Sequence, residues 1–442
     1  MLVAGAVPAR AVVLPGRTPA SARVLGDVAL TARLHELTIE SPSLCTITRA
    51  RVLLPVSYGR RTLTRYPVLY LLHGADSDYR AWTEKVDAAS VTAPHDVIVV
   101  MPDAGRIGFY SNWDAEGVPC APAWEQYHLV ELRRILQTRY RTNGRYAVAG
   151  QSMGGFGALS YASRHPDLFS AVASFSGAVD TRFDEPVVPW VFGLLTGFVS
   201  GISSGIWGDF TTSEVRWRGH NPLDLAPNLR GTAVFLSAGT GASGPLDPPG
   251  EANLVGLGVL ETAIHAMNVE YSDRLRAVGV AATDDIDRPG THNLAYGLAS
   301  LARWMPDIMR ALSVPRAVPA DFTYRSAERR FSVWGWSFAT ANDAPTFTDV
   351  RVAGDTVSAT GRGPLDVTTR AAYRPGGRYL LVDAGGEHPV RADGSGRLRF
   401  TVRLGDTAER YSLLPDLPGP RPRGAPVAVS IRPSRAGTGA GR

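Results

Sequence analysis

The segment GQSMGG, residues Gly150 to Gly155, decides the fold that we predict for this 442-residue chain. An apolar run that starts at Arg145 leads into it, and helix-forming residues follow from Phe156. A strand, a sharp turn and a helix in this order are typical of a turn that strains the backbone of a serine and exposes its hydroxyl. We therefore identify Ser152 as the candidate nucleophile.

A second segment, Gly201 to Gly205, also fits the Gly-x-Ser-x-Gly pattern. No strand-like run precedes it, and the glycines around it recur at helical spacing. Short motifs match by chance, so the structural context decides between the two. Only Ser152 has the expected context.

Composition limits the classes of function. Hydrophobic residues make up 44% of the chain and charged residues 20%, which is typical of a globular protein with a sizeable core. The net charge is +5, but no run of basic residues stands out, so we expect no nucleic-acid partner. No metal-ligand cluster, phosphate-binding loop or dinucleotide fingerprint occurs, so we expect no metal and no cofactor.

Apolar runs of strand length alternate with helix-like segments, which predicts a mostly parallel sheet covered on both faces. Two earlier segments, Val28 to Ile39 and Thr46 to Pro55, alternate apolar and polar residues, as an antiparallel leading pair would. The fold class is therefore α/β, with an α/β-hydrolase sheet. The predicted parallel strands are Tyr66 to His73, Val97 to Asp103, Tyr146 to Ser152, Ala171 to Gly177, Ala233 to Gly239 and, more weakly, Val280 to Ile286.

The chain changes character after residue 312, where a segment with two prolines reads as a linker. Short alternating runs separated by glycine-rich turns then predict a small all-β, sandwich-like domain, whose function the sequence leaves open. The predicted strands there are Phe331 to Trp336, Asp349 to Val352, Thr356 to Thr360, Tyr379 to Val382, Leu398 to Leu404 and Val427 to Ile431. The predicted organisation is an N-terminal segment (1–24), a catalytic domain (25–312), a linker (313–320), the β domain (321–433) and a flexible tail (434–442).

Two features concern the compartment. The first residues, Met1 to Ala11, resemble the end of an export signal but lack its basic start and full apolar core. Cys45 and Cys120 would pair in an exported protein or stay separate as buried thiols, and the sequence leaves both readings open. We expect a secreted or cell-envelope protein.

An uncharged segment from Pro186 to Gly208 is long enough to span a bilayer. It lies between predicted strands of one sheet, however, and a single span would put Ser152 and its partners on opposite sides of a membrane. We therefore predict a lid and no integral membrane span.

The chain order serine, acid, histidine of α/β-hydrolases identifies the base. His292 follows the last predicted strand, where its imidazole could take the Ser152 proton and return it to the leaving group. Three carboxylates precede it at suitable positions: Asp247, Glu251 and Glu261. Position alone slightly favours Asp247, and the residues leave the choice open.

The tetrahedral intermediate needs two backbone N–H donors. The first is Met153, directly after the nucleophile. The second is expected in the loop after the strand that ends in Leu71-Leu72-His73-Gly74, and Ala75 N–H is the candidate there. The plain alternative is that His73 and Gly74 form an ordinary turn at the end of a strand.

Several separated motifs resemble the esterase D superfamily, and within it the secreted antigen 85-type mycolyltransferases and their esterase relatives. They span residues 25 to 312 and leave the C-terminal region outside the resemblance. In order, they are Leu71-Leu-His-Gly, Asp78-Tyr-Arg-Ala-Trp82, Phe109-Tyr-Ser-Asn-Trp113, the Ser152 turn, Ile206-Trp-Gly and Gly290-Thr-His292.

The resemblance implies further roles. It favours Glu261 over Asp247 as the acid, and it makes the uncharged segment the wall of an acyl channel. It assigns substrate-binding positions to His73, Trp82 and Trp113. Two positions depart from the mycolyltransferases, which have an aspartate at His73 and a tryptophan at Leu294, so the resemblance leaves specificity for a sugar acceptor open.

We accordingly expect a serine carboxylic ester hydrolase that acts on acyl esters through an acyl-enzyme, with Ser152, His292 and Glu261 as a triad. The alternative is an acyltransferase that moves the acyl chain to a carbohydrate hydroxyl. A third reading is a non-catalytic envelope-binding protein.

Overall fold

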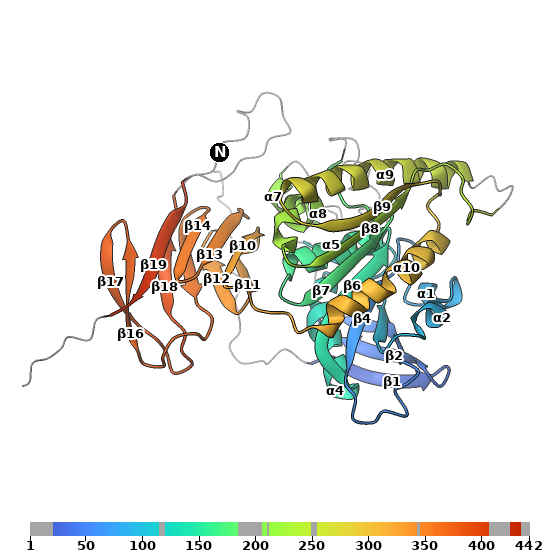
Figure 1. The fold of residues 1–442 in the computed structure, drawn as a ribbon, viewed down its shortest axis with the longest axis horizontal. Helices are drawn as coiled ribbons and strands as arrows, with labels where there is room; N and C mark the ends of the chain where they lie inside the picture. Colours follow the sequence, from blue (N-terminus) through green and yellow to red (C-terminus); the bar gives the residue numbers. More distant parts are fainter. Residues whose placement is uncertain are drawn as a thin grey trace, which may run out of the picture.

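The computed structural model describes residues 21–114, 120–183, 206–209, 212–248, 254–342, 345–405 and 425–434. An α/β part is followed by two antiparallel sheets that lie beside it (Figure 1). The N-terminal 20 residues, Glu251, the second Gly-x-Ser-x-Gly segment and most of the predicted lid lie outside the described residues.

The α/β part is built on one nine-stranded sheet in the order β1-β2-β3-β5-β4-β6-β7-β8-β9. Its strands are β1 (Arg23–Ala29), β2 (Leu34–Ser41), β3 (Thr46–Leu53), β4 (Tyr66–Leu72), β5 (Ile98–Pro102), β6 (Thr142–Gln151), β7 (Phe169–Phe175), β8 (Ala233–Gly239) and β9 (Ala282–Arg288). Its helices are α1 (Ala81–Glu84), α2 (Ala88–Thr92), α3 (Trp124–Gln126), the π-helix η1 (Tyr127–Leu132), α4 (Arg133–Arg139), α5 (Met153–Arg164), α7 (Glu214–His220), α8 (Pro222–Leu225), the 3₁₀ helix η2 (Ala226–Leu229), α9 (Leu254–Ala277) and α10 (Leu294–Ser313).

Strands β4 to β9 run parallel to one another, whereas the pairings β1–β2, β2–β3 and β3–β5 are antiparallel. Alternate residues of the parallel strands pack on opposite faces: Val68 and Tyr70 lie in the core with α5 and α9, and Leu69 and Leu71 in the core with α10. Both faces are thus covered, which explains why these strands are continuously apolar.

The leading antiparallel element differs from the prediction. Val28 to Ile39 is not one strand, because the chain reverses after Ala29 and returns as β2, with Ala29 opposite His35. The amide of Leu30 donates to the carbonyl of Leu34 in this turn. A hairpin of two half-exposed strands shows the same alternation as one long strand, which is why the pattern concealed the turn.

The C-terminal region forms a six-stranded sheet, β10-β13-β14-β19-β16-β17, and a four-stranded sheet, β11-β12-β15-β18. One apolar core, which includes Val357 and Leu365, joins them as a sandwich. The strands are β10 (Asp321–Ser326), β11 (Arg330–Val333), β12 (Trp336–Thr340), β13 (Thr348–Ala353), β14 (Thr356–Thr360), β15 (Pro364–Thr368), β16 (Arg378–Asp383), β17 (Gly386–Arg391), β18 (Arg399–Arg403) and β19 (Val427–Pro433).

Three strands of the sandwich, β10, β15 and β17, were not expected from the sequence. The predicted strand Phe331 to Trp336 is instead the end of β11, a turn at Trp334-Gly335 with positive φ at both residues, and the start of β12.

Helix α10 ends at Ser313 and β10 begins at Asp321, and polar contacts join the sandwich to the α/β part beside it. The hydroxyl of Tyr324 donates to the carbonyl of Arg164 at 2.6 Å. The side-chain amide of Asn228 donates to Arg325 O at 2.9 Å and accepts from Arg325 N–H at 2.8 Å. These contacts fix the sandwich against the C-terminal end of α5.

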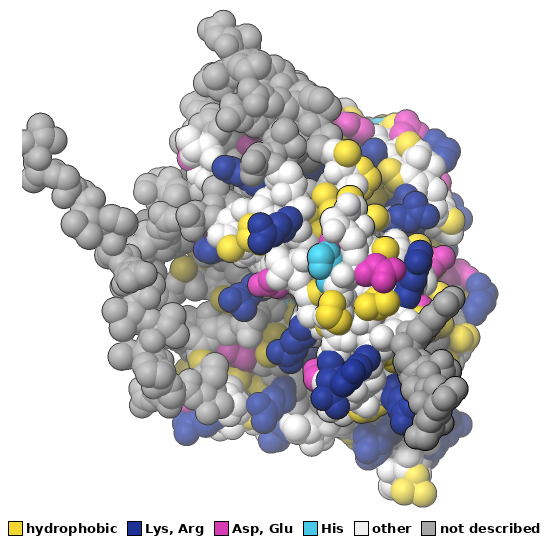
Figure 2. Space-filling model, turned by 90° about the vertical axis from the view of Figure 1, so that its left-hand side faces the viewer, with side chains coloured by type: hydrophobic (Ala, Val, Ile, Leu, Met, Phe, Trp, Pro, Cys, Tyr) yellow, Lys and Arg dark blue, Asp and Glu magenta, His cyan; other side chains and the backbone are white. Residues whose placement is uncertain are grey.

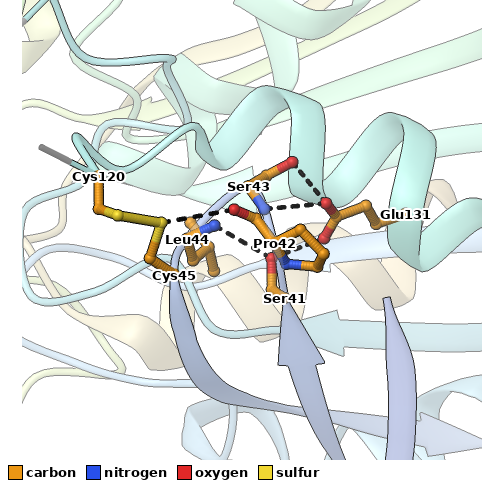
Figure 3. The surroundings of a disulfide bond; sticks show 7 residues. All are labelled: Ser41, Pro42, Ser43, Leu44, Cys45, Cys120 and Glu131. Carbon is orange, nitrogen blue, oxygen red and sulfur yellow. Dashed lines mark hydrogen bonds between the residues drawn. A yellow bond between two sulfur atoms is a disulfide. The ribbon is translucent and has the colours of Figure 1, made fainter. Parts of the chain in front are cut away.

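Cys45 and Cys120 form a disulfide, which answers the question that the sequence left open (Figure 3). It ties the turn between β2 and β3 to the segment before α3. Glu131 of η1 holds the same turn, because its carboxylate accepts from the Ser41 hydroxyl at 2.6 Å and from Ser43 N–H at 3.0 Å.

Two features are missing from the part of the chain that the structure describes. Among the described residues there is no helix of the length and apolarity needed to cross a membrane. The same residues contain no cluster of three or more His, Cys, Asp or Glu side chains placed to hold a metal ion.

On the sandwich end of the molecule, basic and acidic side chains are interspersed over the described surface (Figure 2).

Candidate active site

Ser152 stands between the end of β6 and the start of α5, with φ +58° and ψ −122°. This backbone conformation is unfavourable for a residue with a side chain, and its surroundings must maintain it. Ser152 N–H donates to Phe175 O at 2.9 Å, which ties the turn to the end of β7. The side chain of Ser152 is partly exposed.

Close packing explains the glycines of this turn. A Cβ on Gly150 would lie 2.3 Å from Gly154 O, and a Cβ on Gly154 would lie 2.4 Å from Leu72 O. Real side chains do not tolerate such contacts. The glycines therefore let α5 start directly against β4 and β6, and this places the first amide of the helix beside the serine.

His292 and Glu261 are brought together from separate elements. His292 lies in the loop between β9 and α10, and its Nδ1–H donates to Glu261 Oε2 at 2.6 Å. Glu261, on α9, is 0% exposed. Its other oxygen accepts from the Ser176 hydroxyl at 2.7 Å and from Gly239 N–H at 2.6 Å. These donors satisfy the hydrogen-bonding capacity of the buried carboxylate.

Asp247, the acid that position alone favoured, has other hydrogen-bond partners. It accepts hydrogen bonds from the Thr291 hydroxyl at 2.5 Å and the Tyr296 hydroxyl at 3.0 Å. Burial acts to raise the pKa of Asp247, but these donors and Gly244 N–H outweigh it and leave the pKa below its ordinary value. Asp247 thus fixes the loop that carries His292.

Within the described residues, Ser152 Oγ and His292 Nε2 are not hydrogen-bonded to each other. Catalytic hydrogen bonds are often long in the absence of substrate and shorten when substrate binds. A hydrogen bond between Ser152 Oγ and His292 Nε2 is therefore part of the proposed mechanism.

The two candidate oxyanion donors lie on either side of the serine. Met153 N–H is at the N-terminal end of α5. Ala75 follows Gly74, where a Cβ would lie 3.3 Å from Ser152 Cβ. Neither amide donates to another residue in the described part of the chain. Both are therefore available to a negatively charged oxygen.

The ring of His73 is buried. It is 1% exposed, its Nδ1–H donates to Gly74 O at 2.8 Å, and its Nε2 accepts from Ala104 N–H at 3.0 Å. The Tyr110 hydroxyl donates to His73 O at 2.8 Å. Burial raises the pKa of Tyr110 well above its ordinary value, so this donor keeps its proton. These contacts give His73 and Tyr110 a part in holding the Gly74-Ala75 loop.

The two tryptophans assigned to substrate binding are held in different ways. Trp82 is 0% exposed and donates from Nε1 to Leu72 O at 3.0 Å, so it packs in the core beneath the site. Burial argues against direct substrate contact by His73 and Trp82. Trp113 is only partly buried and donates from Nε1 to Gly108 O at 3.0 Å.

Sequence reasoning missed Ser176 and Gly239, which complete the hydrogen bonding of Glu261. Both stand at the carboxyl ends of buried strands, β7 and β8. A polar residue directly after a buried strand of a parallel sheet is a recognisable signal for a site at that edge. That signal could have identified Ser176.

Comparison with known proteins assigns the α/β part, which carries the candidate site, to a protein family. Residues 41–309 match the model of a protein family described as "Putative esterase". This span includes Ser152, Glu261 and His292 and ends within α10. The sandwich lies outside it.

Two curated relatives illustrate the similarity. Esterase Rv1288 of Mycobacterium tuberculosis is 35% identical over 249 residues, which are 54% of this chain and 51% of that protein. The chain thus spans about half the length of this relative. The diacylglycerol acyltransferase/mycolyltransferase Ag85B of Mycobacterium leprae is 30% identical over 266 residues, 57% of this chain and 78% of that protein.

Two solved structures share the fold. Mycobacterium tuberculosis MPT51 superposes with a TM-score of 0.52 at 23% identity and covers 64% of this chain and 100% of its own. An S-formylglutathione hydrolase from Agrobacterium tumefaciens gives a TM-score of 0.50 at 17% identity, with 65% and 99% coverage. Both likenesses concern the α/β fold.

Proposed function

Because the chain belongs to this esterase family of α/β-hydrolases, we propose that it hydrolyses carboxylic esters through an acyl-enzyme on Ser152. The observation that carries the proposal is the Nδ1–H of His292 donating to the buried carboxylate of Glu261 at 2.6 Å. A carboxylate in this position fixes the tautomer of the imidazole and stabilises the imidazolium that forms during the reaction.

The proposed reaction has two halves. Ser152 Oγ attacks the ester carbonyl while His292 Nε2 takes its proton, and the N–H groups of Met153 and Ala75 stabilise the oxyanion. The C–O bond to the leaving alcohol breaks, and the imidazolium returns the proton to that alcohol. Water then attacks the acyl-enzyme with His292 again as the base, which releases the acid and restores the serine.

Labelling with a fluorophosphonate tests the nucleophile. We expect one adduct on Ser152 in the wild type and none in Ser152→Ala, as read by mass spectrometry of the intact protein and its peptides. Ser358→Ala, on strand β14 of the sandwich, is the matched control and should label normally. A folded wild type that does not label at Ser152, and does not hydrolyse p-nitrophenyl butyrate, would support a non-catalytic binding protein instead.

Transfer to a carbohydrate hydroxyl is the second candidate. It is favoured by the names of relatives such as Ag85B, a diacylglycerol acyltransferase/mycolyltransferase. Transfer requires an acceptor that competes with water for the acyl-enzyme. The two candidates are distinguished by turnover of p-nitrophenyl butyrate with and without excess trehalose, followed by mass spectrometry. Hydrolysis predicts butyrate alone, and transfer predicts acylated sugar.

We also propose that the protein works outside the reducing cytoplasm. The Cys45–Cys120 disulfide supports this location, because such bonds persist in oxidising compartments. Native cells treated with a thiol-alkylating reagent before lysis should yield protein with both cysteines protected. Alkylation of either cysteine in most molecules would argue for a reducing compartment.

A further inference from the structure

A groove of about 620 Å³ lies between the α/β part and the sandwich. Residues of α3 and η1, among them Gln126 and Val130, form one wall, and strands β11, β12 and β15 contribute the other. The groove reaches Arg164 and His165 at the C-terminal end of α5, whereas Ser152 is at the N-terminal end. A 12-residue helix is about 18 Å long, so the groove is well separated from the candidate active site.

The sandwich side of the groove is rich in small polar side chains. Ser332 pairs with Ser337 across β11 and β12, and Ser337 pairs with Thr368 across β12 and β15, so these three hydroxyls form one row. Asp366 lies in the next row, beside Ala339. Strand residues alternate between faces, so the neighbouring Val333 and Val367 point into the sandwich core, while the hydroxyls face the groove, which Phe331 and Phe338 also line.

The two walls are held in a fixed relation. Arg164 donates to Glu328 Oε1 at 2.8 Å, and the hydroxyl of Tyr324 donates to Arg164 O at 2.6 Å. Both contacts join α5 to the sandwich, and all three residues line the groove. A cavity of this size with walls already in place is typical of a ligand site.

The charges in the groove largely neutralise one another. Glu125 is 5% exposed and its carboxylate bonds both Arg164 and His165, with its Oε1 accepting from His165 at 2.6 Å. Asp366 accepts from the Thr401 hydroxyl at 2.6 Å. Arg330 and Asp366, of opposite sign, both line the groove. This balance disfavours a strongly charged ligand and leaves hydroxyls and amides as the groups that select one.

We propose that the groove binds a neutral oligosaccharide segment. Serine, threonine and amide side chains can donate to and accept from sugar hydroxyls, while the side chain of Val130 offers apolar surface to the C–H face of a ring. Val130 is 46% exposed, so its side chain is accessible to a ligand in the groove. Bound in this way, a glycan would hold the enzyme on a carbohydrate surface while Ser152 stays accessible.

Binding of defined hexasaccharides to the full chain tests the proposal. We would titrate maltohexaose, cellohexaose and α-1,5-arabinohexaose as neutral probes, and hexagalacturonate as the anionic one, by calorimetry and by NMR of the sugar. At least one neutral probe should bind at micromolar to low millimolar concentration. Asp366→Ala and Thr368→Val should each weaken that binding at least fivefold, and Ser337→Trp, which fills the groove, should abolish it.

Ser358→Ala is the matched control, because this serine is on the other sheet and outside the groove. Its affinity should equal that of the wild type, and melting temperatures should show that all variants are folded. Binding of no neutral probe, binding of hexagalacturonate alone, or equal affinity in the Asp366 and Thr368 variants would overturn the proposal. The measurement needs no turnover, so its result is independent of the esterase proposal.

Discussion

Glu261 is the side chain that connects several parts of the candidate site through hydrogen bonds. It accepts three hydrogen bonds, from His292 Nδ1–H, the Ser176 hydroxyl and Gly239 N–H, at 2.6, 2.7 and 2.6 Å. All three are donors, so only an acceptor fits there. A carboxylate satisfies them, whereas a group that itself donates leaves at least one buried donor without an acceptor.

Replacing Glu261 by glutamine therefore has a predictable cost. The amide nitrogen would face either His292 or the pair Ser176 and Gly239, and the imidazolium would lose its counter-charge. We expect kcat for p-nitrophenyl butyrate to fall by about 10² to 10⁴, with KM little changed. Steady-state kinetics of Glu261→Gln measures both constants.

Asp247→Asn is the comparison that separates the two candidate acids. Asp247 bonds Thr291 and Tyr296 and acts on His292 only through the loop, so we expect kcat to fall by less than about tenfold. A larger loss in Asp247→Asn than in Glu261→Gln would reverse the assignment.

At the residue scale, the sequence predicted the nucleophile and base candidates from motif and chain order. The residues alone left Asp247 and Glu261 open, and the family resemblance favoured Glu261. The contact that distinguishes the two carboxylates joins residues 31 positions apart, which no local pattern specifies. The burial of His73 was also hidden, because a histidine after a strand can equally face a ligand or turn back to the backbone. Its neighbours Gly74 and Ala104 decide this, and they meet only in the folded chain.

At the scale of elements, the junction of β6 and α5 depends on space for backbone. A methyl group on Gly154 would lie 2.4 Å from Leu72 O and 2.7 Å from His73 O. Gly154→Ala should therefore push the start of α5 away from β4 and lower the free energy of unfolding by about 1 to 3 kcal/mol. Because Met153 N–H would move with the helix, we also expect kcat to fall at least tenfold, as measured by denaturant unfolding and kinetics.

Gly59→Ala is the control for this substitution. No atom lies within 4 Å of a Cβ at Gly59, so stability and kcat should stay near the wild-type values. If Gly154→Ala matched Gly59→Ala in both measurements, close packing at the turn would not explain the glycine.

The disulfide joins two segments that are distant in sequence, and its removal tests how much it contributes to stability. It closes a separation of 75 residues, for which the chain-entropy estimate is about 4 kcal/mol. The double variant Cys45→Ser, Cys120→Ser should melt at a lower temperature than the oxidised wild type. Its kcat at 25 °C should be retained, since the bond is not part of the candidate site, and reduced wild type should behave alike. An unchanged melting temperature would contradict this account.

Helices and strands could be predicted from the sequence where their buried residues form a regular apolar pattern. Strands buried on both faces, such as β4 and β5, are continuous apolar runs and were predicted within about two residues. Strand β17 (Gly386–Arg391) carries a proline and charged residues and is mostly exposed, so no apolar pattern marks it. Its pairing with β16 specifies it, and that information is not local.

At the scale of the whole molecule, the α/β part and the sandwich meet around buried charge. Arg164 bonds Glu125 and Glu328 and donates to Gly219 O at 2.8 Å, at the end of α7. His220 follows Gly219 and is 6% exposed; its Nδ1–H donates to Arg216 O at 2.9 Å. Burial, and then the charge of Arg164, lower the pKa of His220 to about 4.

This shift makes the stability of the assembled molecule depend on pH with a definite sign. Above pH 6.5 His220 is neutral in both states, but between pH 6.5 and 4 the unfolded chain binds a proton that the folded one does not. His220 should therefore lower the free energy of unfolding by about 1.4 kcal/mol per pH unit as the pH falls through that window. Asparagine keeps the donor to Arg216 O but does not titrate. The free energy of unfolding of His220→Asn, measured in urea, should therefore depend less steeply on pH than that of the wild type, whatever the absolute stability of the variant. Equal slopes in His220→Asn and the wild type would show that His220 does not cause the pH dependence.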